Sequence, residues 1–303
     1  MNVSGGTLQV NVDGNLGDPS NAITFDGGGA LRGSSSGSFT ATARNFIAAA
    51  GGGGVDTNGT DLTHTGTITG PGTFFKYGAG NLTVNNVRSG GLFVSGGKVT
   101  VAAGRSTAHT SLVNTLAVGP GNTLDLNDND LAINYSGTSP LPTVQAGIAS
   151  GYNGGSWSGT GITSSAAAAQ AGSAHKTALG YGEASAVFSS FPASFSGQSV
   201  DNTSVLVRYT YAGDANLDGT VDTLDFNALA GNFGGTGKVW TQADFNYDGV
   251  VDTLDFNNLA ANFGQQLSTQ AGAGALVPEP ATAAFAACGF EALVTAHRRK
   301  RAR

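Results

Sequence analysis

Glycine breaks the first 135 residues into short runs in which apolar and polar side chains alternate. The chain holds 48 Gly among 303 residues, about twice the usual share, and they follow no collagen period. Runs such as 7–12 (TLQVNV), 98–104 (KVTVAAG) and 131–135 (LAINY) place one set of side chains on one face of a strand. The pattern predicts a mainly β fold of many short strands. Periodicity alone does not choose between a stacked solenoid and a β-sandwich.

One stretch bears on that choice. Residues 74–101 read FFKYGAGNLTVNNVRSGGLFVSGGKVTV and resemble the autotransporter-associated β-strand repeat. The matching positions are Lys76, Gly78, Gly80, Leu82 and Val84 in the first half, and Leu92, Val94 and the Gly pair 96–97 in the second. The resemblance implies a right-handed β-solenoid on a secreted or cell-surface protein, and it implies no chemistry.

The β-repeat region is predicted to span residues 1–135. Because the first residues already follow the alternating pattern, we expect this region to be truncated at its start. Residues 136–212 are predicted to cap the β region, since open sheet edges must be covered. Helices are predicted at 143–149 and within the Ala-rich segment 164–180, and the β-branched run 203–211 predicts a strand.

Two nearly identical lines, 213–234 and 243–264, together contain eight Asp. Each fits D-x-N-x-D-G-x-x-D-x-x-D, the spacing of an EF-hand calcium loop. Ca²⁺ takes about six to eight oxygen ligands, Gly at position 6 permits the sharp bend, and position 7 offers its carbonyl. The predicted ligands of the two Ca²⁺ ions are Asp214, Asn216, Asp218, Thr220, Asp222 and Asp225, and then Asp244, Asn246, Asp248, Val250, Asp252 and Asp255.

Each loop is followed by apolar residues at spacings of three and four, which predict one helix per loop. These residues are Phe226, Leu229 and Phe233, then Phe256, Leu259 and Phe263, with Gly234 and Gly264 as expected C-caps. No helix is predicted before either loop. Tandem half-hands with Asp at position 12 resemble the dockerin type I domain, and the predicted domain spans 213–266.

The dockerin resemblance implies a small α module that binds two Ca²⁺ and docks onto a cohesin-type partner, often in polysaccharide-degrading assemblies. The sequence departs from the usual pattern of Ser-Thr after position 9 and a basic pair in the helix. The corresponding residues are Thr223–Leu224 and Thr253–Leu254, with Ala230–Gly231 and Ala260–Ala261 in the helices. The resemblance therefore supports calcium binding more strongly than it supports a cohesin-type partner.

The C-terminal residues have the composition of a linker (267–276) followed by a sorting signal (277–303). A VPEP box, an apolar stretch at 281–296 and a basic end resemble the PEP-CTERM signal of exported bacterial proteins. This resemblance implies transient membrane insertion and an exosortase-type processing enzyme. The apolar stretch is shorter than the roughly 20 residues of a membrane span and is interrupted by Glu291.

Charge and motifs argue against two function classes. Five of the 14 Lys and Arg lie in the last six residues, so the remainder carries nine basic against 20 acidic residues, which argues against a nucleic-acid partner. The His residues (64, 109, 175 and 297) lack Cys or carboxylate neighbours at metal spacing, and no Gly-x-Ser-x-Gly motif occurs. No catalytic and no cofactor-binding residue is assigned.

Two groups leave alternatives open. Asp125, Asp128 and Asp130 are interpreted as capping a turn, with paired carboxylates for glycoside chemistry as the alternative. Tyr152 and Trp157 are interpreted as cap residues, with sugar stacking as the alternative. The favoured function is a secreted or cell-surface, non-catalytic β-repeat protein whose dockerin-like module mediates assembly. The alternative is a subunit of a polysaccharide-degrading (glycoside hydrolase or lyase) system with a polysaccharide ligand.

Overall fold

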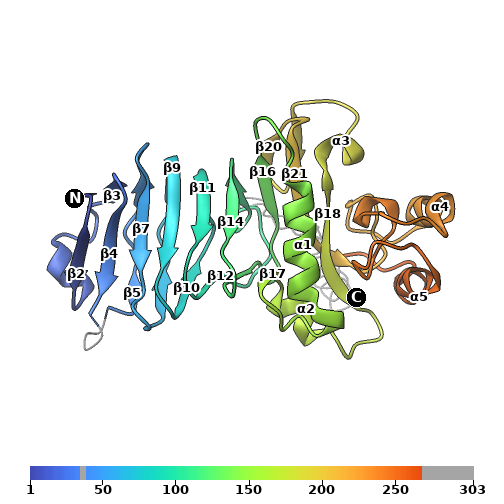
Figure 1. Cartoon of the computed structure of the whole chain (residues 1–303), viewed down its shortest axis with the longest axis horizontal. Coiled ribbons are helices and arrows are strands. Elements are labelled where there is room, and N and C mark those ends of the chain that lie inside the picture. The colour runs from blue at the N-terminus through green and yellow to red at the C-terminus, as the bar shows by residue number, and fades with distance from the viewer. Residues whose placement is uncertain (35–38, 268–303) are drawn as a thin grey trace, which may run out of the picture. The chain divides into compact units, whose positions relative to one another are not determined.

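The first part of the chain is a β-solenoid of about six turns, in which short parallel strands stack coil upon coil (Figure 1). The computed structural model describes residues 1–34 and 39–267, which belong to one compact unit. A small helical region follows the solenoid on its C-terminal side. The predicted mainly β solenoid is thereby confirmed, and the sandwich alternative is excluded.

The strands form three columns along the stack, and neighbours within each column run parallel. The first holds β1 (Asn2–Ser4), β3 (Ile23–Asp26), β6 (Phe46–Ala48), β9 (Ile68–Tyr77), β11 (Arg88–Val94), β13 (Ser111–Val113) and β16 (Leu131–Asn134). The second holds β2 (Thr7–Val10), β4 (Gly29–Gly33), β7 (Gly53–Asp56), the second halves of β9 and β11, and β14 (Leu116–Val118). The third holds β5 (Ala41–Thr42), β8 (Leu62–His64), β10 (Asn81–Val84), β12 (Lys98–Val101), β15 (Thr123–Asp125) and β17 (Gly161–Thr163). A 3₁₀ helix, η1 (Asp13–Leu16), follows β2.

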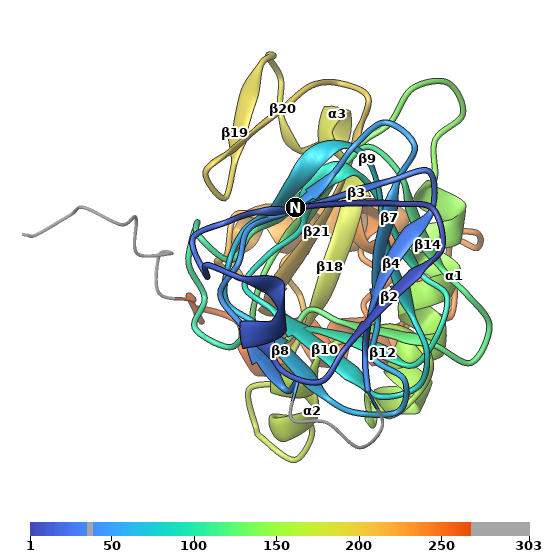
Figure 2. The same ribbon diagram turned by 90° about the vertical axis from the view of Figure 1, so that its left-hand side faces the viewer.

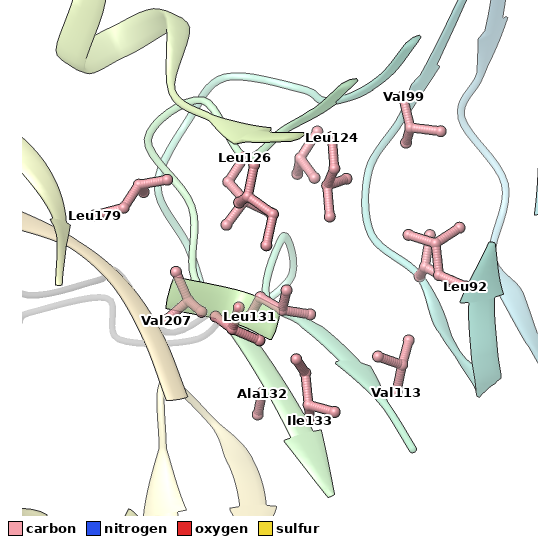
Figure 3. Close-up of a cluster of buried hydrophobic side chains, with 14 of the residues drawn as sticks. Leu92, Val99, Val113, Leu124, Leu126, Leu131, Ala132, Ile133, Leu179 and Val207 are labelled. Atoms are coloured by element: carbon pink, nitrogen blue, oxygen red, sulfur yellow. The ribbon is translucent and has the colours of Figure 1, made fainter. Parts of the chain in front are cut away.

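The parallel register stacks apolar side chains from successive coils in a common interior. Figure 2 shows the coils of the ribbon end-on. Phe25, Phe46 and Phe74 are fully buried, with ring centroids 5.4 Å apart for the first pair and 6.2 Å apart for the second. Figure 3 shows the same packing near the C-terminal end of the stack, where Leu124, Leu126 and Leu131 belong to one cluster of buried side chains. Burying each such side chain stabilises the fold by about 1.5–3 kcal/mol, so the coils hold together without disulfides.

Lys76 is buried in this apolar interior, in register with Val55 and Val94 of the adjacent strands. Its Nζ donates to the carbonyl oxygens of Tyr77 (3.0 Å), Gly78 (2.8 Å) and Gly96 (2.9 Å). Burial lowers the pKa of the Lys76 ammonium to about 8. Lys76 therefore satisfies the turn carbonyls of two successive coils.

The position two residues after Lys76 requires a glycine, Gly78. Its φ is +70°, in the left-handed region, and a Cβ there would lie 2.2 Å from Asp56 Oδ1. Only glycine fits both constraints. The Lys-x-Gly pattern of the sequence thus has a packing reason in this chain.

Residues 136–212 follow the parallel coils of the solenoid. Their elements are α1 (Leu141–Tyr152), η2 (Asn153–Gly155), α2 (Ser165–Ala169), β18 (Thr177–Glu183), α3 (Ala184–Val187), β19 (Ala193–Phe195), β20 (Gln198–Val200) and β21 (Ser204–Tyr211). β21 pairs antiparallel with both β16 and β18, which ends the parallel stack. The strand predicted at 203–211 is β21, and the helix predicted at 143–149 lies within α1.

The Ala-rich segment 164–180 forms less helix than predicted. Its helix is α2, five residues long, and the segment's last residues enter β18. Pairing along the whole of β21 outweighs the helix propensity of alanine, which is a weak preference.

The remaining elements are α4 (Thr223–Asn232), η3 (Trp240–Gln242) and α5 (Thr253–Asn262), which make up the helical module coloured orange in Figure 1. As predicted, no α-helix precedes either loop: β21 comes before the first, and the single turn η3 before the second. Within residues 1–34 and 39–267, the helices are all too short or too polar to span a bilayer. The sorting signal predicted at 277–303, and the predicted linker beyond Leu267, lie outside the described residues.

Candidate metal centre

Each predicted calcium loop is a tight turn closed by its own first residue. In the first loop, Asp214 Oδ1 accepts a hydrogen bond from the Asp218 amide (3.2 Å) and Oδ2 accepts one from the Gly219 amide (2.9 Å). Gly219 has φ +93°, so the bend predicted at position 6 uses the conformational freedom of glycine. These two hydrogen bonds fix the orientation of the Asp214 carboxylate, at the first ligand position.

The second loop repeats this geometry closely. Asp244 Oδ1 accepts from the Asp248 amide (3.1 Å), and Oδ2 accepts from the Gly249 amide (3.0 Å). Gly249 has φ +82°. Because nearly identical sequences adopt nearly identical turns, the two loops have the same binding chemistry.

Positions 9 and 12 link each loop to its helix. Asp222 is the N-cap of α4 and accepts from the Leu224 amide (2.7 Å), while Asp225 Oδ2 accepts from the Asp222 amide (2.8 Å). Asp225 Oδ1 also accepts from the Ala215 amide (2.8 Å), back in the loop. Position 12 therefore lies in the first helical turn, as predicted. The second loop repeats the arrangement with Asp252, Leu254, Asp255 and Phe245.

The carboxylates of positions 1 and 12 are buried close together in each loop. Asp214 and Asp225 are fully buried, as are Asp244 and Asp255. Burial raises the pKa of Asp214 to about 7, with a smaller contribution in the same direction from the neighbouring Asp225. Burial raises the pKa of Asp244 to about 7 as well, and it raises those of Asp225 and Asp255. Each loop therefore holds negative charge that a divalent cation would stabilise.

The donor set fits calcium in its chemistry. Each loop offers carboxylate oxygens, one Asn side-chain oxygen and the carbonyl of position 7, all hard ligands suited to Ca²⁺. Asn216 and Asn246 place their amide groups against Asp218 and Asp248, at 2.9 and 2.8 Å. In the described part of the chain, no three His, Cys, Asp or Glu side chains are gathered as a metal-holding group. In both loops several of the acidic oxygens instead accept backbone N–H groups.

The predicted ligands of each loop lie along one turn and differ in their exposure. Positions 1 and 12 are buried, position 5 is exposed, and positions 3, 7 and 9 are intermediate. The exposed members are Asp218 and Asp248, and the intermediate ones are Asn216, Thr220, Asp222, Asn246, Val250 and Asp252.

The two halves are tied to each other by backbone hydrogen bonds. The Val221 amide donates to Gln265 O (2.9 Å), and the Gly264 amide donates to Val221 O (2.8 Å). Val251 makes the matching pair with Gly235 (3.0 Å) and Gly234 (2.8 Å). Position 8 of each loop thus pairs with the chain beyond the other helix, and Leu229 and Leu259 are buried between the halves. The loops form one unit.

The apolar helix residues divide into a core and a surface set. Leu229 and Leu259 are buried, whereas Phe226, Phe233, Phe256 and Phe263 are 42–54% exposed. Leu224 and Leu254 are also exposed, at 59% and 56%. We call these six exposed residues the apolar surface of the module. The predicted helices are present, but most of their predicted apolar face does not contribute to the core.

Three residues that support the loops were not identified from the sequence. The Thr210 hydroxyl donates to Asp214 Oδ2, and Trp240 Nε1 donates to Asp214 O (2.6 Å). The Tyr247 hydroxyl contacts Leu179 of β18. Tyr247 and its counterpart Leu217, both apolar at position 4 of a polar loop, are the signal available in the sequence.

The other candidate residues have structural roles. Asp125, Asp128 and Asp130 each accept backbone N–H groups, from Ser165 (2.9 Å), Arg105 (3.0 Å) and Tyr209 (3.0 Å) in turn. Trp157 is 5% exposed, and its ring lies 5.3 Å from that of Tyr152. Both observations agree with the turn and cap interpretations.

Comparison with known families found one match, the dockerin type I domain, over residues 212–263. The match covers both loops and both helices and agrees with the predicted boundaries to within a few residues. Dockerin domains bind calcium and typically bind cohesin partners. Comparison with curated proteins and with solved structures gave no match.

Proposed function

We propose that this chain is a secreted or cell-surface, non-catalytic β-solenoid protein whose dockerin-like module binds two Ca²⁺ ions and docks a cohesin-type partner. The observation that carries the proposal is the apolar surface of the module, repeated in both halves beside two complete calcium loops. It contains six of the nine large hydrophobic residues exposed in the described part of the chain. A soluble module that exposes phenylalanine twice at equivalent positions is typical of a docking site.

Calcium binding is assigned to the twelve predicted ligands, six in each loop. Without cations, burial and, to a smaller extent, mutual repulsion favour protonation of the carboxylates in each loop, as the raised pKa values of Asp214 and Asp244 indicate. Two divalent ions reverse both effects. The module is small, so ion binding contributes directly to its folding free energy.

Calorimetry on the full chain tests the calcium assignment. Titration of Ca²⁺ should give two bound ions, and Asp225→Ala or Asp255→Ala should each remove one. Asp201→Asn, an exposed Asp of the cap, is the control and should leave the stoichiometry at two. Absence of binding heat, or two ions in both loop variants, would contradict the assignment.

The apolar surface predicts a partner with an apolar binding face, because residues that are usually polar in dockerin domains are apolar or uncharged here. Leu224 and Leu254 stand where Ser-Thr pairs are usual, and the exposed helix positions 230–231 and 260–261 carry no charge. Hydrophobic burial would therefore dominate the contact, with residues such as Phe226 and Phe256 as central anchors.

Capture of immobilised cohesin-type domains tests this surface. Binding should require Ca²⁺ and should weaken strongly in the double variant Phe226→Ser/Phe256→Ser. Leu8→Ser, which alters an exposed apolar residue in the first solenoid coil, is the matched control and should bind normally. Binding that survives EDTA, or that the double variant retains, would exclude this surface.

A second candidate function, membership of a polysaccharide-degrading system, is favoured by one observation. Phe75, Tyr77 and Phe93 are half-buried side chains on β9 and β11, with centroids 5.5 Å apart for Phe75–Tyr77 and 5.7 Å for Phe75–Phe93. Partly exposed aromatic rings in a row suit the faces of sugar rings. Affinity electrophoresis in plant and algal polysaccharides, with Phe93→Ala as the variant, tests binding, and release of reducing sugar would show catalysis.

Export and tail processing complete the proposal. They rest on the resemblance of residues 277–303 to a sorting signal, and these residues lie outside the described structure. Mass spectrometry of the protein recovered from its native cells should show the chain ending near Pro278–Pro280 and the protein in the medium or on the surface. An intact C-terminus on intracellular protein would contradict an exosortase-type step.

A further inference from the structure

The calcium module packs directly against the strands that close the solenoid. β18 carries glycine at 180 and 182, where a Cβ would lie 2.5 Å from Leu217 Cδ2 and 2.4 Å from Thr241 Cγ2. The missing side chains make room for the module. His175 Nδ1 also lies 2.8 Å from Ala261 O, at the far end of α5.

Tyr247 forms the centre of this contact. Its hydroxyl accepts from the Leu179 amide (3.2 Å) and donates to the Leu179 carbonyl (3.1 Å), in the middle of β18. Its ring centroid lies 4.8 Å from that of Tyr152 and 5.4 Å from that of Trp240. With 7% of its surface exposed, the residue is an anchor seated in an aromatic pocket of the cap.

The position of Tyr247 in the chain ties this anchor to the second calcium loop. It is residue 4 of the loop, between the predicted ligands Asn246 and Asp248, and its φ is +63°. Leu217, at the same position of the first loop, has φ +59°, so the left-handed conformation belongs to the turn of both loops. A change in this turn would move the Tyr247 hydroxyl relative to Leu179, so the conformation of the second loop and the contact with β18 depend on each other.

We infer that Tyr247 is a positioning residue for the second calcium loop, and that it couples Ca²⁺ binding to the order of the closing strand β18. The inference rests on the calcium binding proposed above. Repulsion among Asp244, Asp248 and Asp255 favours the open loop when no cation is present, and Ca²⁺ favours the closed loop that seats the anchor. This coupling is reciprocal: if Ca²⁺ binding favours the ordered cap by a given factor, the ordered cap increases the affinity for Ca²⁺ by the same factor.

Hydrogen exchange on the full chain, with excess Ca²⁺ and with EDTA, tests the coupling. We expect amides of β18, including Leu179, to exchange about tenfold more slowly with Ca²⁺, within the usual range for two coupled sites. These amides belong to the solenoid cap, so a locally ordered loop alone would not protect them. Equal exchange in β18 under both conditions, while residues 244–255 respond to Ca²⁺, would overturn the inference.

Calorimetry on Tyr247→Phe supplies the second measurement. The variant keeps the ring and loses the hydroxyl that makes both bonds to Leu179, so the Ca²⁺ affinity of the second loop should fall at least about fivefold, the net equivalent of one of these bonds. Tyr77→Phe is the matched control: Tyr77 lies on β9 of the solenoid, away from the module and from β18, and its Ca²⁺ affinity should be unchanged.

The outcomes separate the two proposals. An unchanged affinity in Tyr247→Phe overturns the coupling and leaves calcium binding intact. Absence of Ca²⁺ binding in the unaltered chain overturns both. If Tyr247→Phe fails to fold, the exchange comparison on the unaltered chain still decides.

Discussion

Trp240 Nε1 donates a hydrogen bond of 2.6 Å to the carbonyl oxygen of Asp214, the first predicted ligand of the first calcium loop. Trp240 belongs to η3, which leads into the second loop, and its side chain is fully buried. The Trp240 indole therefore links the segment that enters the second loop to the first predicted ligand of the first loop. Its ring also lies 5.1 Å from that of Phe245, within the second loop.

Replacing this indole should weaken the module. Trp240→Phe leaves the Asp214 carbonyl without its buried donor and leaves a small cavity, so the free energy of unfolding should fall by about 2 kcal/mol. Urea denaturation with Ca²⁺ and with EDTA measures the change. Trp157, the other tryptophan, remains as the fluorescence probe. A loss below about 0.5 kcal/mol, the range of a surface substitution, would show that the bond contributes little.

The sequence predicts the calcium loops well because their chemistry is local. All six ligand positions of a loop fall within twelve residues, and Gly219 marks the bend. The contact between Tyr247 and Leu179 is different, because the two residues are 68 positions apart. Nothing in the pattern of either segment indicates that they meet, so the attachment of the module to the cap appears first in the structure.

The strands of the solenoid could also be predicted from the sequence, but their arrangement relative to one another could not. Alternation in runs such as 98–104 reports which side chains point inward, but it holds equally for a sandwich. What makes a solenoid is the register between coils, as between Lys76 and its strand partners Val55 and Val94, which are 21 and 18 residues away. That spacing is not constant along the chain, so periodicity alone could not establish it. The exposed Phe226 shows a second limit of sequence patterns. Helical spacing predicts that apolar residues share one face of a helix, but it does not predict whether that face packs in the core or remains exposed.

The buried ammonium of Lys76 should be essential to the solenoid. Lys76→Met keeps the length of the side chain but removes the ammonium donor from the Gly78 and Gly96 carbonyl oxygens, whereas Tyr77 O keeps the Thr57 amide, so stability should fall by about 3 kcal/mol. Thermal unfolding followed by far-ultraviolet circular dichroism measures this. Lys176→Met, at an exposed cap position, should change stability by less than about 0.5 kcal/mol. Equal effects of the two substitutions would exclude a role for the buried cation.

Packing of the module on β18 can be tested through its glycines. In Gly180→Ala the new Cβ would lie 2.5 Å from Leu217 Cδ2 and 2.6 Å from Trp240 Nε1, so one of these groups must move. Overpacking of this kind should cost about 1–3 kcal/mol. Gly172→Ala is the matched control, since a Cβ there meets no atom within 4 Å. Limited proteolysis should cut the module of Gly180→Ala sooner, whereas a cleavage pattern identical to the control would argue against tight packing at this strand.

Stability without calcium should depend on pH in the direction opposite to that of most acidic sites. Burial raises the pKa of Asp214 and of Asp244 from the ordinary value of 3.8 to about 7, so the folded state binds more protons than the unfolded chain between these values. Stability of the calcium-free protein should therefore fall as pH rises from about 4 to 7 and level off above. Excess Ca²⁺ binds the ionised carboxylates and should reverse the trend, so that its stabilising effect grows over the same window. Unfolding temperatures measured from pH 4 to 8 in EDTA and in Ca²⁺ give the two curves, and parallel curves would contradict both the buried carboxylates and their role as ligands.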